Sequence, residues 1–159
     1  MLQKVSSQKI SASGGAFTVV AAQYNARYVD AMLRAAQTVL RRAGGRVQVL
    51  RVPGAYEIPV VAAKLARTSP PPAAIICLGV ILRGATTHAQ FIGEAVSRAL
   101  MQIQVRHEVP VIHEVLLLEN ESQARERCLS RTHNRGAEAA QTALAMAQVM
   151  AGLESTDAW

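Results

Sequence analysis

The chain has 159 residues, of which half are hydrophobic and only 4% are aromatic. This length suits one compact domain with a substantial core, so a second domain is not expected. Because aromatic residues are scarce, the core must be built from Ala, Val, Leu and Ile. That composition favours helices packed closely on a parallel sheet over a β-sandwich.

The formal net charge is +6, and a basic balance is common in nucleic-acid-binding proteins. Here the basic residues are scattered over every expected helix, only Arg41 and Arg42 are adjacent, and no aromatic residues alternate with them. We therefore expect a solvated surface with an anion-binding site, and no nucleic-acid partner.

Charged residues such as Arg83, Arg98 and Glu108 interrupt the longest apolar runs before eighteen residues, which excludes a transmembrane helix. Residues 1–15 lack the apolar core of a signal peptide, so we expect a cytoplasmic protein with a flexible N-terminal extension over 1–15 and a single domain over 16–159. Cys77 and Cys128 have no metal-ligand spacing and should be reduced thiols.

The first half of the chain alternates strand and helix patterns. A strand is expected at 16–22, and Asn25 is a candidate N-cap for a helix that Gly44 and Gly45 end. Arg46 to Val52 alternates polar and apolar residues, which predicts a strand near the sheet edge. A helix should then begin at Tyr56 and Glu57 and run to about residue 67, with a proline tolerated in its first turn.

The apolar run from Ala73 to Leu82 predicts a strand buried on both faces, as in parallel sheets. Glycine, two threonines and His88 follow it and open a helix from about Thr87 to His107. Open α/β sheets bind ligands beyond the carboxyl ends of their strands. The segment after Leu82 is therefore the expected centre of the site.

The next strand is expected from Val109 to Leu118, where His113 and Glu114 interrupt an apolar run. At least one of these two side chains should face a site, a subunit contact or solvent. Asn120 forms a capping-box pattern for a short helix to about residue 129, and a last helix begins at residue 134 or 136 and runs to about 150. The order predicts an α/β, three-layer αβα sandwich with a four-stranded parallel, flavodoxin-like sheet and helices on both faces.

The turn after the central strand looks like a phosphate-binding loop, but Ala85 stands where a P-loop requires lysine. Its backbone amides and the Thr86 hydroxyl could still hold one phosphate, unless Thr86 is an ordinary helix cap. His88 lies where the helix dipole disfavours imidazolium, which suits a neutral base, although a structural histidine is the commoner case. Arg127 and Arg135 are either phosphate ligands or surface arginines.

Several ordered segments together resemble the 6,7-dimethyl-8-ribityllumazine synthase family, over about residues 16 to 150. The residues that carry the resemblance are Tyr24-Asn25, Val52 to Pro59, Leu78-Gly79 with Ile81, Arg83 to His88, Pro110-Val111, Gln123-Ala124 with Glu126-Arg127, and Asn134-Arg135-Gly136 with Glu138-Ala139-Ala140.

The resemblance implies the penultimate step of riboflavin biosynthesis, without metal or organic cofactor. In that reaction 5-amino-6-(D-ribitylamino)uracil condenses with 3,4-dihydroxy-2-butanone 4-phosphate, and phosphate and water are released. It also implies a homo-oligomer, a pentamer that in some members forms a 60-subunit shell, with sites at subunit interfaces. Riboflavin synthase is then a possible pathway partner, and no membrane partner is implied.

The resemblance also implies residue roles. His88 would be catalytic and shuttle protons, Arg135 would be a secondary charge near the phosphate, and no residue would bind metal. The implied pyrimidine and ribityl contacts are Tyr24, Asn25, Ala55, Tyr56, Glu57, Val80, Ile81, Leu82 and His113, and the implied phosphate contacts are Gly84, Ala85, Thr86 and Arg127.

The chain departs from the family pattern at three places. His113 and Glu114 replace an aromatic–glycine pair, Arg135 replaces a lysine, and Ala89-Gln90-Phe91 replaces an aromatic–acidic–aromatic run. These changes leave open a lumazine- or flavin-binding relative that has lost turnover. A flavodoxin-like nucleotide module would require the whole set of motifs to be a coincidence.

Overall fold

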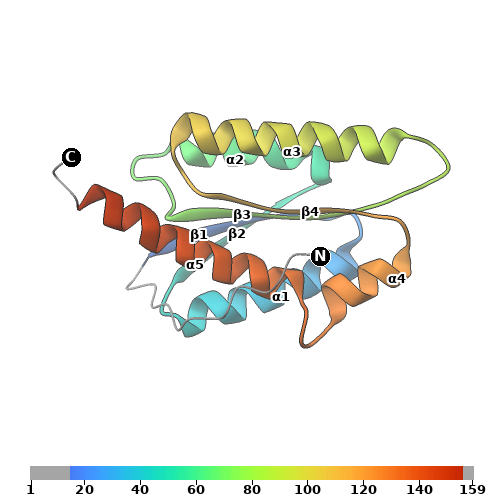
Figure 1. Ribbon diagram of the computed structural model, residues 1–159, viewed down its shortest axis with the longest axis horizontal. Coiled ribbons are helices and arrows are strands. Elements are labelled where there is room, and N and C mark those ends of the chain that lie inside the picture. The colour runs from blue at the N-terminus through green and yellow to red at the C-terminus, as the bar shows by residue number, and fades with distance from the viewer. Residues whose placement is uncertain (1–14, 156–159) are drawn as a thin grey trace.

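The computed structural model describes residues 15–155, and the predicted α/β sandwich is confirmed (Figure 1). Apart from Gly15, the extension predicted over residues 1–15 lies outside the described residues. Four parallel strands form one sheet in the order β2-β1-β3-β4. Their bounds are β1 (Ala16–Ala22), β2 (Arg46–Val52), β3 (Ala74–Leu82) and β4 (Val111–Leu118).

Helices cover both faces of this sheet. Figure 1 shows α2 and α3 on one face, and α1, α4 and α5 on the other. The bounds are α1 (Ala26–Arg42), α2 (Ile58–Ala66), α3 (His88–His107), α4 (Glu121–Ala124) and α5 (Arg135–Glu154), with a 3-10 turn η1 (Ala55–Glu57) and a π turn η2 (Arg125–Leu129). The polypeptide thus changes sides of the sheet between α1 and α2 and again between α3 and α4.

Strand β3 lies inside the sheet and β2 at its edge, as their sequence patterns predict. Ala74 to Ile81 are all buried, because helices cover both faces of β3. On the α1 and α5 side the core includes Phe17, Met32, Leu40, Ile76 and Leu78. On the α2 and α3 side it includes Val20, Ile58, Cys77, Val96 and Leu100. Small and branched side chains therefore fill both layers.

Two predicted helix boundaries were wrong. Helix α2 begins at Ile58, and the residues before it form η1, because a proline fits only the first positions of a helix and Pro59 takes one of them. Helix α5 continues four residues beyond the predicted end, to Glu154. The helix predicted to reach residue 129 does end at Leu129, although only Glu121–Ala124 is α-helical and Arg125–Leu129 forms the π turn η2.

Close packing of α5 on α1 depends on a glycine at the start of α5. A Cβ atom at Gly136 would overlap the carbonyl oxygen of Met32 in α1. The Asn134 side chain caps α5 by accepting a hydrogen bond from the Gly136 amide at 2.9 Å. The cap and the glycine together place the N-terminus of α5 directly against α1.

None of the helices within residues 15–155 combines the length and the apolar character needed to cross a membrane.

Candidate active site

The ends of β1 and β3 are joined by one side chain. Asn25, just after β1, donates a hydrogen bond from Nδ2 to the carbonyl oxygen of Val80 at 2.7 Å. Its backbone is left-handed, with φ of 56°, a conformation that asparagine tolerates better than most residues. Asn25 occupies the predicted N-cap position of α1, but its side chain bonds to β3 and makes no cap hydrogen bond.

A second contact joins the exits of β1 and β2, meaning the residues directly after those strands. The amide of Tyr24 donates to the carbonyl oxygen of Pro53 at 3.0 Å. A Cβ atom on Gly54 would lie 2.9 Å from Tyr24 Cδ2 and 3.0 Å from Glu57 Oε2. The tyrosine ring and the glutamate carboxylate therefore both lie against Gly54. A side chain at position 54 would displace one or both of them.

Two tyrosines are exposed at these exits. Tyr24 is 70% and Tyr56 is 64% exposed, although large aromatic side chains usually lose most of their exposure in folded proteins. Ala55 lies beside β3, where its Cβ would be 3.5 Å from a Cβ on Gly79. The exits of β1, β2 and β3 thus come together at the carboxyl-terminal end of the parallel strands, here called the site edge.

The residues of β3 that the sequence assigns to the site expose little side chain. Val80 and Ile81 are buried and Leu82 is partly buried, so only their backbone is suited to ligand contact. The carbonyl of Val80 already accepts from Asn25. The backbone amide of Arg83 donates to Leu118 O at 2.8 Å, and its side chain pairs with Glu119 at 3.2 Å, which ties the end of β3 to that of β4.

The turn between β3 and α3 is open to solvent. Gly84, Ala85 and Thr86 are exposed, and a Cβ on Gly84 would meet no atom within 4 Å. His88 is the first residue of α3 and is also exposed. Its amide donates to the Thr86 hydroxyl at 3.4 Å, a long hydrogen bond that leaves this hydroxyl only weakly engaged. The turn has free space and donors for an anion.

Comparison with known proteins identifies the family. The family model described as 6,7-dimethyl-8-ribityllumazine synthase matches residues 14–151. A protein of that name from Clostridium kluyveri is 34% identical over 154 residues, covering 95% of this chain and 99% of the relative. Another from Desulfotalea psychrophila is 38% identical over 148 residues, covering 91% and 95%. The chain belongs to the 6,7-dimethyl-8-ribityllumazine synthase family.

His113 lies away from the site edge of its own chain. It is the third residue of β4, five residues before the strand ends, which corresponds to about 16 Å along the strand. Its Nε2 lies 2.7 Å from Ser97 Oγ in α3, and its Nδ1 accepts from the Val115 amide at 3.1 Å. Burial lowers the pKa of His113, and a hydrogen bond to its backbone offsets part of this effect.

Glu114 points to the opposite face of β4, where it is buried beneath α5. Its Oε1 accepts from Arg135 Nε at 2.7 Å, and Arg135 Nη1 donates to Glu138 Oε2 at 2.7 Å. Burial raises the pKa of Glu114, and the positive charges of Arg135 and Arg127 offset part of that rise. Burial acts against the Arg135 cation, but the two carboxylates outweigh it and raise the pKa of Arg135. Arg135 is therefore held by two carboxylates.

Arg127, in η2, is exposed. Within residues 15–155, neither Arg127 nor Arg135 has a hydrogen bond or ion pair to the turn from Gly84 to His88. The implied site residues of this family member thus form two groups in one chain. One group surrounds the site edge, and the other lies along β4, η2 and the start of α5.

Both cysteines are free and buried, as expected for reduced thiols. Burial raises the pKa of Cys77 far above its ordinary value, and burial together with Glu114 raises that of Cys128 to about 11. A protonated, buried thiol is a poor nucleophile. Neither cysteine is suited to covalent chemistry in this family member.

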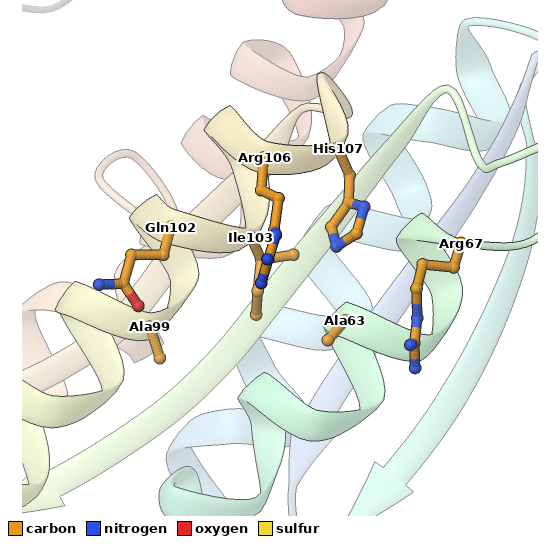
Figure 2. A pocket seen from close by; sticks show the side chains of 7 residues that line it. All are labelled: Ala63, Arg67, Ala99, Gln102, Ile103, Arg106 and His107. Carbon is orange, nitrogen blue, oxygen red and sulfur yellow. The ribbon is translucent and has the colours of Figure 1, made fainter.

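A cavity of about 540 Å³ lies between α2 and α3, near the ends of these helices that are remote from the site edge. Figure 2 shows Arg67 of the segment after α2 and Arg106 and His107 of α3 around it, with Ala63 and Ala99 leaving the space open. None of the residues implied for the family's reaction lines this cavity. The site edge is therefore distinct from this cavity.

Three residues with a part in these contacts were missed from the sequence. Gly54 could have been found, because it lies between Pro53 and the Tyr56-Glu57 pair, where a turn must bring the backbone close to other groups. Ser97 carries no such signal, and Glu138 is part of the family resemblance without an implied contact. Each lies in a long helix, and its role depends on which helix face meets β4.

Proposed function

We propose that the chain condenses 5-amino-6-(D-ribitylamino)uracil with 3,4-dihydroxy-2-butanone 4-phosphate to form 6,7-dimethyl-8-ribityllumazine, phosphate and water. The observation that carries this proposal is the family match over residues 14–151. Relatives that bear the name of this enzyme align with 91% to 95% of the chain. No residue at the site edge argues for the alternative, a binding protein that has lost turnover.

The pyrimidine and its ribityl chain would lie against the exits of β1 and β2. The exposed ring of Tyr24 offers a stacking surface, and the Glu57 carboxylate beside Gly54 can accept hydrogen bonds from ribityl hydroxyls. Asn25 fixes this surface to β3 through its bond to Val80. Tyr56 and Ala55 flank it, and the backbone of Ile81 and Leu82 would face the pyrimidine edge.

The phosphate would lie at the turn from Gly84 to Thr86. Open space at Gly84 lets an anion approach the backbone amides at the start of α3, where the helix dipole favours negative charge. Arg127 is the arginine that we propose as its counter-charge. Arg135 is less suited to bind phosphate directly, because its guanidinium already contacts two carboxylates.

His88 would move the protons in the reaction. Imine formation requires the amine of the pyrimidine to lose protons and the carbonyl oxygen to leave as water, and phosphate elimination requires a base at the adjacent carbon. An exposed imidazole at the start of α3, next to the phosphate turn, can reach both centres. Positioning of the two substrates side by side would supply much of the rate acceleration.

We propose that two copies of the chain share each site, within a homo-oligomer such as a pentamer. His113, Arg127 and Arg135 would then complete the site edge of a neighbouring copy, which agrees with the position of His113 about 16 Å along β4 from its own site edge. Exposed apolar side chains on α3 favour a subunit contact. They are Phe91, Met101 and Val105.

The direct test mixes the two substrates with the purified protein and follows the absorbance of the lumazine product. Formation well above the uncatalysed rate is expected. A protein that binds the lumazine tightly but forms no product above that rate would support the binding-protein alternative. Sedimentation velocity on the same sample measures the oligomeric state, and a monomer would contradict the shared site.

A further inference from the structure

His113 and Ser97 connect the edge strand β4 to helix α3. The side chain of His113 lies on the α3 side of the sheet, since Glu114, its neighbour, lies on the α5 side and successive residues of a strand alternate. The residue paired with His113 on the neighbouring strand β3 is Cys77, whose buried thiol is uncharged. Within the described residues, no charged side chain hydrogen-bonds or ion-pairs with His113.

The directions of the hydrogen bonds fix which ring nitrogen carries the proton. The Val115 amide can only donate, so His113 Nδ1 must accept and cannot carry a proton. In the neutral ring the proton is then on Nε2, which donates to Ser97 Oγ at 2.7 Å. The Ser97 hydroxyl in turn donates to the carbonyl oxygen of Gly93 at 2.7 Å.

This chain of hydrogen bonds excludes one obvious role for the pair. A serine next to a histidine can act as a nucleophile when the imidazole accepts the serine proton. Here Nε2 donates its proton to Ser97 Oγ, and the serine hydroxyl donates its own proton to the carbonyl oxygen of Gly93. His113 therefore cannot act as a base that removes the serine proton. The contacts hold the imidazole ring from both of its nitrogens, which fixes its plane as well as its tautomer.

We propose that Ser97 is a positioning residue, which holds His113 as a fixed, uncharged ring against which the heterocycle bound in a neighbouring copy's site packs. The inference rests on the proposed function, because it takes that site to be shared between copies. A ring held at both nitrogens loses little freedom when a flat ligand stacks on it. A protonated or freely rotating imidazole would offer a poorer surface.

The first test reads the tautomer directly and needs no enzymatic activity. In the intact protein with ¹⁵N-labelled histidine, the nitrogen shifts of His113 should be those of the Nε2–H form. Because the Val115 amide still donates to Nδ1, Ser97→Ala should keep the Nε2–H form but shift the Nε2 resonance, which loses its hydrogen-bond acceptor, and Ser97→Thr should restore the wild-type shift. The matched control is Thr38→Ala, which removes a hydroxyl bonded to a carbonyl four residues earlier in α1, at 2.9 Å, and should leave His113 unchanged.

The second test measures the affinity for 6,7-dimethyl-8-ribityllumazine by its fluorescence. Ser97→Ala should weaken binding roughly 3- to 10-fold, the range for loss of one hydrogen bond. The same change made in a His113→Phe protein should have no further effect, because a phenyl ring needs no bond from Ser97. An equal loss in both backgrounds would mean that Ser97 supports the fold instead of the ring.

The two tests separate the inference from the proposed function. Unchanged ¹⁵N shifts in Ser97→Ala, or an Nδ1–H tautomer in the wild type, would overturn the inference whatever the enzyme does. Wild-type affinity for the lumazine in Ser97→Ala would also overturn it. Failure to form product from the two substrates would overturn the proposed function alone, because lumazine binding and the tautomer are measured without turnover.

Discussion

The side-chain amide of Asn25 and the backbone carbonyl of Val80 lie 2.7 Å apart, although 55 positions separate them in the chain. This hydrogen bond joins the exit of β1 to β3 beside the exposed Tyr24. It therefore attaches the surface that we propose for the pyrimidine substrate directly to the sheet.

Asn25→Asp should destabilise the protein and weaken binding of the lumazine. Aspartate tolerates the left-handed backbone but cannot donate to the Val80 oxygen, so we expect a loss of about 1–3 kcal/mol in the free energy of unfolding. Urea unfolding measures this loss. Asn25→Gly is the control, because glycine keeps the backbone conformation without placing a carboxylate beside the carbonyl. If Asn25→Asp is as stable as the wild type, the bond contributes nothing.

The sequence predicts this part of the site through topology, because parallel strands must bring their carboxyl ends to one edge. The contact itself could not be predicted. Asn25 has the usual signature of a helix cap, and only the separation between β1 and β3 decides that its amide reaches Val80 instead. The residue type alone favours a hydrogen bond from the Asn25 side chain to the start of α1, but the packing of β1 beside β3 places the Val80 carbonyl within its reach.

His113 and Glu114 illustrate the same limit. Strand alternation alone places two consecutive residues on opposite faces, so their separation follows from the sequence. Their partners do not, because Ser97 and Arg135 meet β4 only through the rotation and position of α3 and α5. The buried ion pair is thus a property of packing, with no signal in the sequence around Glu114.

His88→Ala should lower kcat by about 100-fold or more and leave the affinity for the pyrimidine substrate nearly unchanged, as expected for loss of a general acid–base. Steady-state kinetics with both substrates varied measure the two effects. His107→Ala is the matched control, because His107 is the last residue of α3 and His88 is the first. A collapse of pyrimidine binding in His88→Ala would contradict the proton-transfer role.

Arg127→Ala should raise KM for the phosphorylated butanone by roughly 10-fold, the effect of losing one charge-assisted hydrogen bond, with a smaller change for the pyrimidine. Arg125→Ala is a suitable control, since Arg125 is an exposed arginine two residues away, paired with Glu121 at 3.2 Å. Equal increases in KM for both substrates would count against a phosphate contact at Arg127.

Arg135→Met should destabilise the fold by about 3–5 kcal/mol, because it leaves the carboxylate of Glu114 buried without its partner. Glu114 is only 4% exposed, so solvent cannot replace the lost contact. Arg125→Met breaks an exposed pair and should cost less than about 1 kcal/mol. The comparison uses urea unfolding of both variants. A combined Glu114→Gln and Arg135→Met protein should recover stability, and a further loss would argue against an unpaired charge as the cause.

Gly136→Ala should prevent correct packing of α5 on α1, because the added methyl group would overlap the carbonyl oxygen of Met32. Backbone on both sides cannot give way as a flexible side chain would, so we expect a loss of at least about 3 kcal/mol in the free energy of unfolding, or no folded protein.

Gly152→Ala in the same helix is the control. A Cβ there meets nothing within 4 Å, so the substitution should be neutral or raise stability by up to about 1 kcal/mol. Thermal unfolding compares the melting temperatures of the two variants, even if only part of the Gly136→Ala protein is recovered folded. Equal melting temperatures for both would mean that α5 can move away from α1 without cost.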